Sequence, residues 1–284
     1  MLLLAGDTCS FGGLTLGATD DYGVEWYFLD LDGWGAPQST VQAVQKANAD
    51  GAFATPAFLQ ARVVTVTGAM LAPDRPTLVA AWDRLQAAAP LATAALTVVH
   101  GGADRYVNAQ RQGEISMTEM SDVAIQFSIQ WLCVDPRKFA TDTLTATTGL
   151  PSASGGLTIP FTVPFTIAST VVSGTCFLTN PGNANGPVNL HIAGGPVPCA
   201  GPSVTHVASG LSVTFASSLV LTSTDYIDVD MDNHTVILNG TASRDGYVTS
   251  RGWSPFTPGV NEWAFTSVSG SGASLTVTAT PAWY

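Results

Sequence analysis

Charged side chains are scarce in this chain. Asp, Glu, Lys and Arg make up 11% of its 284 residues, whereas a typical soluble domain carries about 25%. The deficit is concentrated, because no charged residue occurs from Thr143 to Thr224. That stretch contains apolar runs such as Val188–Ile192 and Leu211–Phe215, so we expect it to fold. A folded surface of Ser, Thr, Asn and Gly suits either contact with other subunits or a neutral, sugar-facing β module.

Clusters of basic residues are also absent. The chain has 10 Lys and Arg against 21 Asp and Glu, which gives a net charge of −11. Acidic residues outnumber basic ones by 14 to 8 up to Ala140 and by 7 to 2 after it. Binding of nucleic acid without sequence preference depends on clustered Lys and Arg that displace counterions. The sequence therefore argues against a nucleic-acid-binding protein.

Long apolar runs and paired cysteines are lacking too. No stretch approaches the ~18 apolar residues of a membrane-spanning helix, and the start of the chain lacks the basic segment of a secretory signal, so we expect no membrane insertion. The four cysteines, Cys9, Cys133, Cys176 and Cys199, show no CxxC or paired spacing. We expect reduced, mostly buried thiols made in a cytoplasm, with Cys176 and Cys199 as the one pairing for a structure to check.

No residue pattern typical of catalysis stands out. The sequence has no GxSxG, HExxH or GxxxxGK[ST] pattern. Carboxylates cluster once, and Asp228-x-Asp230-x-Asp232 begins like a calcium loop. The sixth and twelfth positions of that loop are both Asn here, where Gly and Glu are needed. We expect no catalytic residue and no cofactor. At most, Asp228, Asp230 and Asp232 form a weak cation site, and a solvated strand face is the favoured interpretation.

One helix is expected in the first half of the chain. Asp74 precedes it, Pro76 lies in its first turn and Pro90 ends it. Apolar side chains recur at helical spacing between these points, at Leu78, Ala81, Trp82 and Leu85. Such a stripe is typical of a helix that packs on a core.

The clearest strand signal lies between Ser121 and Cys133. Apolar and polar or small residues alternate there with a period of two over eleven residues, which predicts one buried face and one polar, available face. Further strands are predicted at Gly23–Leu31 and Phe58–Thr67, and a hairpin around Gly101-Gly102 is predicted from Thr93–His100 and Asp104–Arg111.

The second half is predicted to contain only strands. Short alternating runs are separated by turn residues at the spacing of a β-sandwich; they are Val188–Ile192, Val204–Val207, Leu211–Phe215, Tyr226–Val229, Thr235–Leu238, Trp263–Phe265 and Leu275–Ala279. Asp232-Asn233 and Asn239-Gly240 are predicted to form turns. We expect a first domain over residues 1–140, a Thr/Ser/Gly-rich junction over 141–156 and a second domain over 157–284.

Several short strings occur in a particular order along the chain. In the first half they are Leu31–Pro37 (LDGWGAP), Asn48–Phe53, the Val63–Gly68 strand with the helix after it, and Asp135–Phe139 (DPRKF). In the second half they are Asn180–Ala184, Asp228–Asp232 running into Val236–Gly240, and Pro258–Trp263. Their order and spacing over nearly the whole chain resemble the distal tail protein (Dit) family of long-tailed bacteriophages, whose members are also labelled minor tail proteins.

The resemblance implies a mainly β, structural protein without catalytic residues. Its first domain would be a β-barrel or sandwich type with one α-helix that joins others in a hexameric ring. Its second would be a galectin-like, carbohydrate-module-like antiparallel β-sandwich. The ring would surround the DNA channel and join the tail tube to the tail-tip hub or baseplate and the adhesion apparatus. Implied partners are further copies of the chain, the major tail tube protein, the tail hub protein, and other tail-tip or receptor-binding proteins. The protein would be assembled in the host cytoplasm and reside in the virion.

Three alternatives remain at this point. A lectin-like adhesion module would be a monomer that binds a host-surface glycan. A glycosidase acting through the carboxylates around Asp230 would lose hydrolysis on Asp230→Asn. A different structural virion protein, such as a tube subunit, would not need the outer sandwich. A closed six-fold ring would separate the leading interpretation from the two soluble alternatives.

The alternating strand supplies the candidates for the core of the ring-forming domain, namely Val123, Ile125, Phe127, Ile129 and Trp131. Its polar face would line or support the tube, and the acidic balance of the chain would leave the channel neutral to negative. Replacing Phe127 with Asp is therefore expected to abolish ring assembly. Intact rings of that variant, seen by a size measurement, would refute the assignment.

Overall fold

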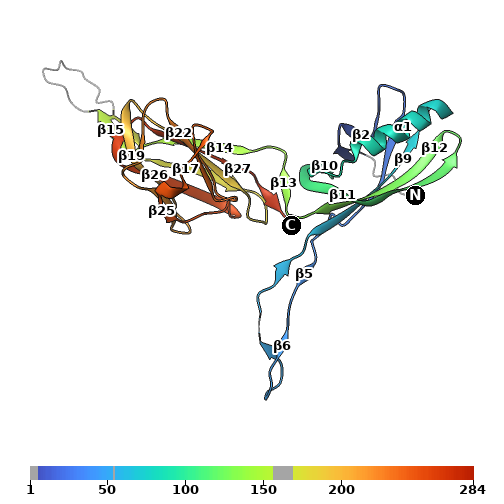
Figure 1. The fold of residues 1–284 in the computed structure, drawn as a ribbon, viewed down its shortest axis with the longest axis horizontal. Coiled ribbons are helices and arrows are strands. Elements are labelled where there is room, and N and C mark those ends of the chain that lie inside the picture. The colour runs from blue at the N-terminus through green and yellow to red at the C-terminus, as the bar shows by residue number, and fades with distance from the viewer. Residues whose placement is uncertain (1–5, 54, 156–168) are drawn as a thin grey trace. The chain divides into compact units, whose positions relative to one another are not determined.

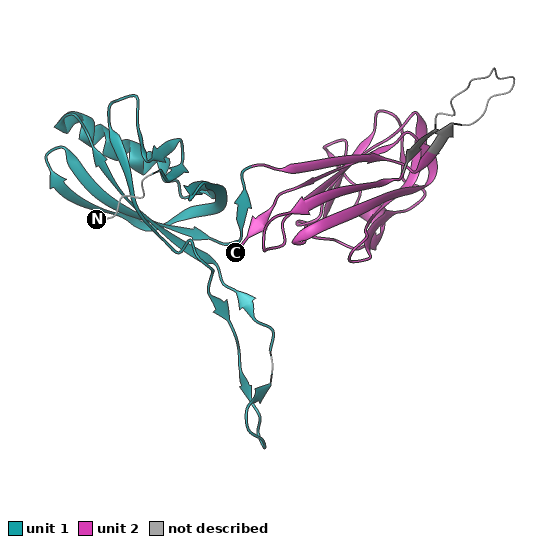
Figure 2. Ribbon diagram, turned by 180° about the vertical axis from the view of Figure 1, so that it is seen from behind, with its two compact units in different colours: residues 1–141, 284 teal, residues 142–283 magenta. Residues whose placement is uncertain are grey.

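The computed structural model describes residues 6–53, 55–155 and 169–284. The chain divides into two compact units, Met1–Thr141 with Tyr284, and Asp142–Trp283 (Figure 2). Each unit encloses a hydrophobic core of its own, as independent folding units do. The described residues are mainly antiparallel strands with one α-helix, so the predicted fold class is confirmed.

Unit 1 is a sheet that carries a helix and a projecting ribbon (Figure 1). Its elements are β1 (Thr8–Phe11), β2 (Leu14–Leu16), β3 (Ala18–Thr19), β4 (Glu25–Asp32), β5 (Ser39–Thr40), β6 (Val44–Gln45), β7 (Ala52–Phe53), β8 (Phe58–Leu59), β9 (Arg62–Leu71), α1 (Arg75–Ala88), β10 (Ala94–His100), β11 (Ala103–Ser121), β12 (Ala124–Cys133) and β13 (Lys138–Ala140).

The sheet of unit 1 has the strand order β2-β1-β10-β11-β12-β9-β4-β3, and β13 also pairs with β11. The long strand β11 joins its two parts, because residues 103–109 pair with β10 and residues 110–121 pair with β12. Alternation in β12 is as predicted: Ile125, Phe127, Ile129 and Trp131 are buried, and the side chains between them are partly or fully exposed.

The predicted helix is also confirmed. The Asp74 carboxylate accepts a hydrogen bond of 2.8 Å from the backbone N–H of Thr77, as an N-cap does. Hydrogen bonds from the side chain and the backbone of Thr77 lower the pKa of Asp74. Leu78, Ala81 and Leu85 are buried in the core, so the apolar stripe covers the sheet.

Two segments differ from the sequence-based expectation. Phe58–Thr67 is not one strand, because Phe58–Leu59 belongs to the projecting ribbon and β9 begins at Arg62. The Thr-rich segment expected to be a junction contains β14 (Leu144–Gly149), which pairs along its whole length with a strand of unit 2. Threonine packs well in strands, and its polarity in this segment conceals the alternation.

Unit 2 is a β-sandwich. Besides β14, its elements are β15 (Ser152–Gly155), β16 (Ser169–Val172), β17 (Thr175–Asn180), β18 (Val188–Ala193), β19 (Val197–His206), β20 (Leu211–Phe215), β21 (Val220–Leu221), β22 (Tyr226–Asp230), β23 (Thr235–Leu238), β24 (Ala242–Ser243), the 3-10 helix η1 (Asp245–Tyr247), β25 (Val248–Arg251), β26 (Gly259–Ser271), β27 (Ser274–Ala279) and β28 (Ala282–Trp283).

One sheet of the sandwich has the order β14-β27-β18-β22-β23-β24, and the other has the order β17-β26-β19-β20-β25 with β21 beside β19. Six of the seven predicted strands of this half lie within observed strands, and the seventh, Val204–Val207, runs one residue past the end of β19. Asn239 and Gly240 adopt positive φ, as their predicted turn requires. The turn predicted at Asp232-Asn233 lies one residue later, because the residue with positive φ is His234.

Buried amides organise the loops of unit 2. The Asn180 side chain donates to the carbonyls of Ala184 and Phe256 and accepts from the N–H of Gly182. Asn261 acts in the same way on the Thr257–Gly259 loop. Both side chains are almost completely buried. These asparagines therefore replace backbone partners that the loops lack.

Because Phe127 lies in the core of unit 1, replacing it tests the stability of the unit as well as assembly. Its side chain is 1% exposed in the core of unit 1, so Phe127→Asp is expected to destabilise the unit by more than about 4 kcal/mol through a buried charge. Ser128→Asp, on the opposite face of β12, should leave the free energy of unfolding nearly unchanged. Chemical denaturation of both variants followed by circular dichroism measures the difference. Equal stabilities would contradict the described core.

Candidate self-assembly surface of unit 1

A two-stranded ribbon, residues 36–61, projects from the sheet of unit 1 between β4 and β9 (Figure 1), and we call it the arm. It is built from the pairs β5–β8 and β6–β7. Its large apolar side chains are exposed, with Phe58 at 71%; the others are Val41, Val44, Phe53 and Leu59. An isolated two-stranded hairpin is marginally stable in water. The arm thus has the apolar side chains of a contact surface and no core of its own.

The base of the arm is fixed by a buried arginine. Arg62 is 2% exposed, and its guanidinium donates to the carbonyls of Gly33 and Gly35 and, at 3.0 Å, to that of Pro136. Burial lowers the pKa of Arg62. Gly33 has φ of 76°, and a Cβ there would lie 1.9 Å from the carbonyl oxygen of Val63, so only glycine fits.

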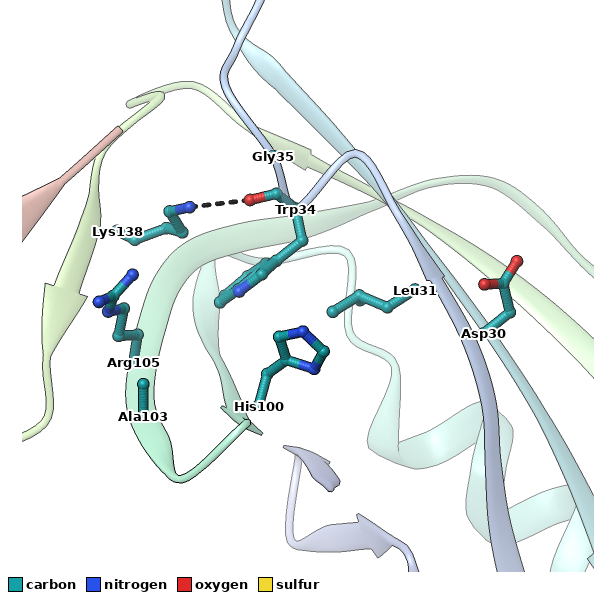
Figure 3. A pocket seen from close by; sticks show the side chains of 8 residues that line it. All are labelled: Asp30, Leu31, Trp34, Gly35, His100, Ala103, Arg105 and Lys138. Carbon is teal, nitrogen blue, oxygen red and sulfur yellow. Dashed lines mark hydrogen bonds between the residues drawn. The ribbon is translucent and has the colours of Figure 1, made fainter. Parts of the chain in front are cut away.

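A buried lysine fixes the same backbone from the other side. Lys138 is 5% exposed, and its ammonium donates a hydrogen bond of 2.8 Å to the carbonyl of Trp34 (Figure 3). The ammonium also lies 5.5 Å from the centre of the Trp34 ring, close enough for a cation–π contact. The strings Leu31–Pro37 and Asp135–Phe139, far apart in sequence, therefore meet at the base of the arm. We call Arg62 and Lys138 with these carbonyls the clamp.

Two stretches of strand edge in unit 1 have no partner among the described residues. On β4, only Glu25 and Trp26 pair with β3, so the outer side of residues 27–32 is open. On β11, the side of residues 112–121 that faces away from β12 is open as well. Open edges present rows of N–H and C=O groups that pair readily with another chain.

The outer face of the same sheet is polar and has few charges. In the middle of this face the outward side chains of β12 and β9 are polar, namely Gln126, Ser128, Gln130, Thr65 and Thr67. Apolar side chains lie at its two ends, Val63 and Leu132 at one and Leu71 at the other. Asp30 and Asp32 of β4 pair with Thr67 and Thr65 and extend this face. Neither Lys nor Arg is among these residues.

The five side chains predicted for the core of the ring-forming domain lie on the inner side of this sheet. Ile125, Phe127, Ile129 and Trp131 are buried in unit 1, and Val123 is partly buried just before β12. They support the sheet from within, and a contact between copies would use the outer face, the edges or the arm. The sequence reasoning missed the arm and its clamp.

The acidic row of unit 2 is used in separate hydrogen bonds. Asp228 bonds the His191 ring at 2.7 Å, and Asp230 accepts from the backbone N–H groups of Asp232 and Asn233. Within residues 6–53, 55–155 and 169–284, no group of three or more His, Cys, Asp or Glu could hold a metal ion. Asp230 thus stabilises the turn after β22, and Asp228 links β22 to β18.

The four cysteines are free and buried. Cys176 and Cys199 do not pair. Burial raises the pKa of Cys9 to about 12 and that of Cys133 and Cys176 to about 11, and it also raises the pKa of Cys199. In the described part of the chain, no helix has the length and apolar character needed to cross a membrane.

The chain shares its fold with a phage distal tail protein. The crystal structure of the SPP1 Dit (gp 19.1) protein, described as a paradigm of the hub adsorption apparatus in phages that infect Gram-positive bacteria, matches with a TM-score of 0.68. The match covers 98% of this chain and 99% of that one at 12% identity, so the likeness is one of fold. The phage P2 baseplate in its activated conformation with Ca matches with a TM-score of 0.47, 10% identity and coverage of 96% and 97%. No protein-family model and no curated protein matches the sequence.

The buried Lys138 of the clamp predicts that the free energy of unfolding depends on pH. Burial, with the nearby Arg62 and Arg105, lowers the pKa of Lys138 from 10.5 to about 8. Between these values the folded chain has released a proton that the unfolded chain still binds, so Lys138 makes stability rise with pH there. Relative to Lys138→Met, the unfolding free energy of the native protein should increase from pH 7 to pH 10.5 by up to about 3 kcal/mol.

Denaturant titration at each pH gives the free energy of unfolding of the native protein and of Lys138→Met. The difference between these two free energies is the quantity to follow with pH. The raised pKa values of the thiols oppose the trend in both proteins and cancel in the difference. Lys46→Met, at an exposed lysine of the arm, is the matched control and should show no such change. A flat difference for Lys138→Met would contradict the buried, charged state of this side chain.

Proposed function

We propose that this chain is a structural virion protein, the distal connector of a phage tail. In this role, copies of the chain form a hexameric ring that joins the tail tube to the tail-tip hub or baseplate. The observation that carries the proposal is the fold shared with the SPP1 Dit protein over 98% of the chain. The chain would act with the major tail tube protein, the tail hub protein and the adhesion apparatus. It would be assembled in the host cytoplasm and have no catalytic activity.

Self-assembly is supported by the surfaces of unit 1. The arm exposes apolar side chains that nothing in the described chain covers, and the clamp fixes the backbone from which it leaves. The open edges of β4 and β11 lie at different places on one sheet. When one edge pairs with a different edge of the next copy, the contact between the copies is head-to-tail. Head-to-tail contacts generate a closed ring when the rotation from each copy to the next adds up to a full turn.

The polar outer face of the sheet supports a role as the lining of a DNA channel. It offers amides, hydroxyls and the carboxylates of Asp30 and Asp32. DNA that moves past this face would find no cluster of Lys or Arg to displace its counterions. A lining of this kind would let DNA pass without holding it.

A second candidate function is glycan binding by unit 2. A hollow of about 410 Å³ lies on the outer face of the sheet that contains β18, β22 and β23. It is lined by Asn189, His191, Asp228 and Thr235 among others, and the Tyr226 ring lies 5.0 Å from that of His191. Amide, imidazole, carboxylate and hydroxyl groups beside an aromatic ring suit the hydroxyls and faces of a neutral sugar.

Removing the arm tests the proposed assembly. A variant in which residues 41–57 are replaced by Gly-Gly should fold, because the exposed arm contributes less than about 1 kcal/mol to the stability of unit 1. It should not form rings, whereas the intact chain should form six-membered rings. Light scattering after size exclusion, negative-stain images and thermal unfolding measure both properties. Rings of the shortened chain would show that the arm is dispensable, and a monomeric intact chain at high concentration would contradict the proposed function.

Saccharide titration tests the second candidate. Galactose, glucose and N-acetylglucosamine, added to 15N-labelled protein, should shift the amide signals of β18 and β22 if the hollow binds sugar. His191→Ala should abolish those shifts, and Thr147→Ala, on the same sheet beside β27, is the control. An unchanged spectrum with all three sugars would remove this candidate.

A further inference from the structure

A pocket of about 440 Å³ lies in unit 1 beside the base of the arm (Figure 3). Trp34 lines it, together with the side chains of His100, Arg105 and Lys138. Figure 3 shows Arg105 and Lys138 next to each other, with the Trp34 and His100 rings on one side of them. The carboxylate of Asp30 points away from Lys138 at the far side of the pocket. Cationic groups thus gather at one end of this pocket.

Lys138 and its neighbour Arg62 are buried cations without a carboxylate. Their acceptors in the described structure are backbone carbonyls, and neither side chain makes an ion pair there. A lysine ammonium has three donors, and one of them is used by Trp34. Arg62 and Arg105 both disfavour the charged form of Lys138 and lower its pKa. An anionic group in the pocket would relieve this repulsion.

The arm of another copy carries a suitable anionic group. Asp50 is the one carboxylate in the sequence from Ala36 to Ala61. It is exposed at the tip of the arm, where the N–H of Lys46 donates to the carbonyl of Gly51. The sixteen residues from Gly35 to Asp50 span up to about 50 Å when extended. A unit of this size is about 40 Å across, so the arm is long enough to cross the unit of a neighbour.

We propose that the pocket binds the Asp50 carboxylate of a second copy, as an ion pair with Lys138 and Arg105. The inference rests on the proposed self-assembly and names the contact that drives it. The arm tip and the pocket are different surfaces of one chain. The contact is therefore head-to-tail, and every copy in a closed ring gives one arm and receives one. The rest of the chain is acidic, so a cationic pocket is complementary to this protein itself.

The primary test removes the charge at the tip. Asp50→Asn lies on an exposed turn and should fold like the native protein. It should raise the dissociation constant for assembly by about 30-fold or more, because the buried ammonium of Lys138 would lose the anion proposed to bind it. Asp83→Asn, at an exposed position of α1, removes the same charge elsewhere and should assemble like the native protein. Native mass spectrometry and light scattering over a concentration series give the dissociation constants.

A charge exchange tests direct contact. Asp50→Lys and Arg105→Glu should each abolish assembly, and the double variant should restore it at least tenfold relative to either single one. Thermal unfolding of each variant establishes that it is folded. Failure of the double variant to recover would overturn the contact.

The outcomes separate this inference from the proposed function. If the native chain stays monomeric at every concentration, self-assembly itself is wrong. If the native chain forms rings and Asp50→Asn forms them at the same concentration as Asp83→Asn, only the Asp50 contact is overturned. If Lys138→Met weakens assembly and Asp50→Asn does not, the pocket binds a different carboxylate, and the assignment to Asp50 is wrong.

Discussion

Two buried cations that bind backbone carbonyls determine where the arm of unit 1 begins. Arg62 and Lys138 donate to the carbonyls of residues 33–35, and Arg62 also binds that of Pro136. Burying a cation is costly unless it is hydrogen-bonded, so these bonds hold the segment in one conformation. The exposed arm then leaves the sheet from a fixed point. A chain whose projecting ribbon could leave in many directions would lose much more entropy when it assembles.

The shortage of charge in unit 2 has a related explanation. The few carboxylates after residue 224 are used to build turns: Asp230 accepts from two backbone N–H groups, and Asp245 accepts from the N–H of Val236. The buried side chains of Asn180 and Asn261 likewise form hydrogen bonds with the backbone of loops in the interior. The surface that remains consists of hydroxyls and amides, which can lie against a protein or a sugar at a low desolvation cost.

The sequence predicted the regular parts of this structure and missed the arm. Alternation identified β12 because its inward residues are all apolar, and spacing identified α1 from its buried stripe and Asp74 cap. The clamp was missed because Arg62 and Lys138 resemble ordinary surface residues. One signal was available: Arg62 shares the inward parity of Val64 and Val66 in β9. The bonds themselves join residues far apart in sequence, which periodicity does not report. Likewise, Thr-rich β14 was read as a junction because polarity concealed its pairing with β27.

The four buried thiols have a consequence for how the chain responds to its redox surroundings. The thiolate is the reactive form of cysteine, and burial keeps these groups protonated near neutral pH. They neither cross-link in an oxidising medium nor depend on reduction to stay apart. The fold therefore does not depend on a disulfide between these cysteines, and its stability should be the same in reducing and in oxidising media.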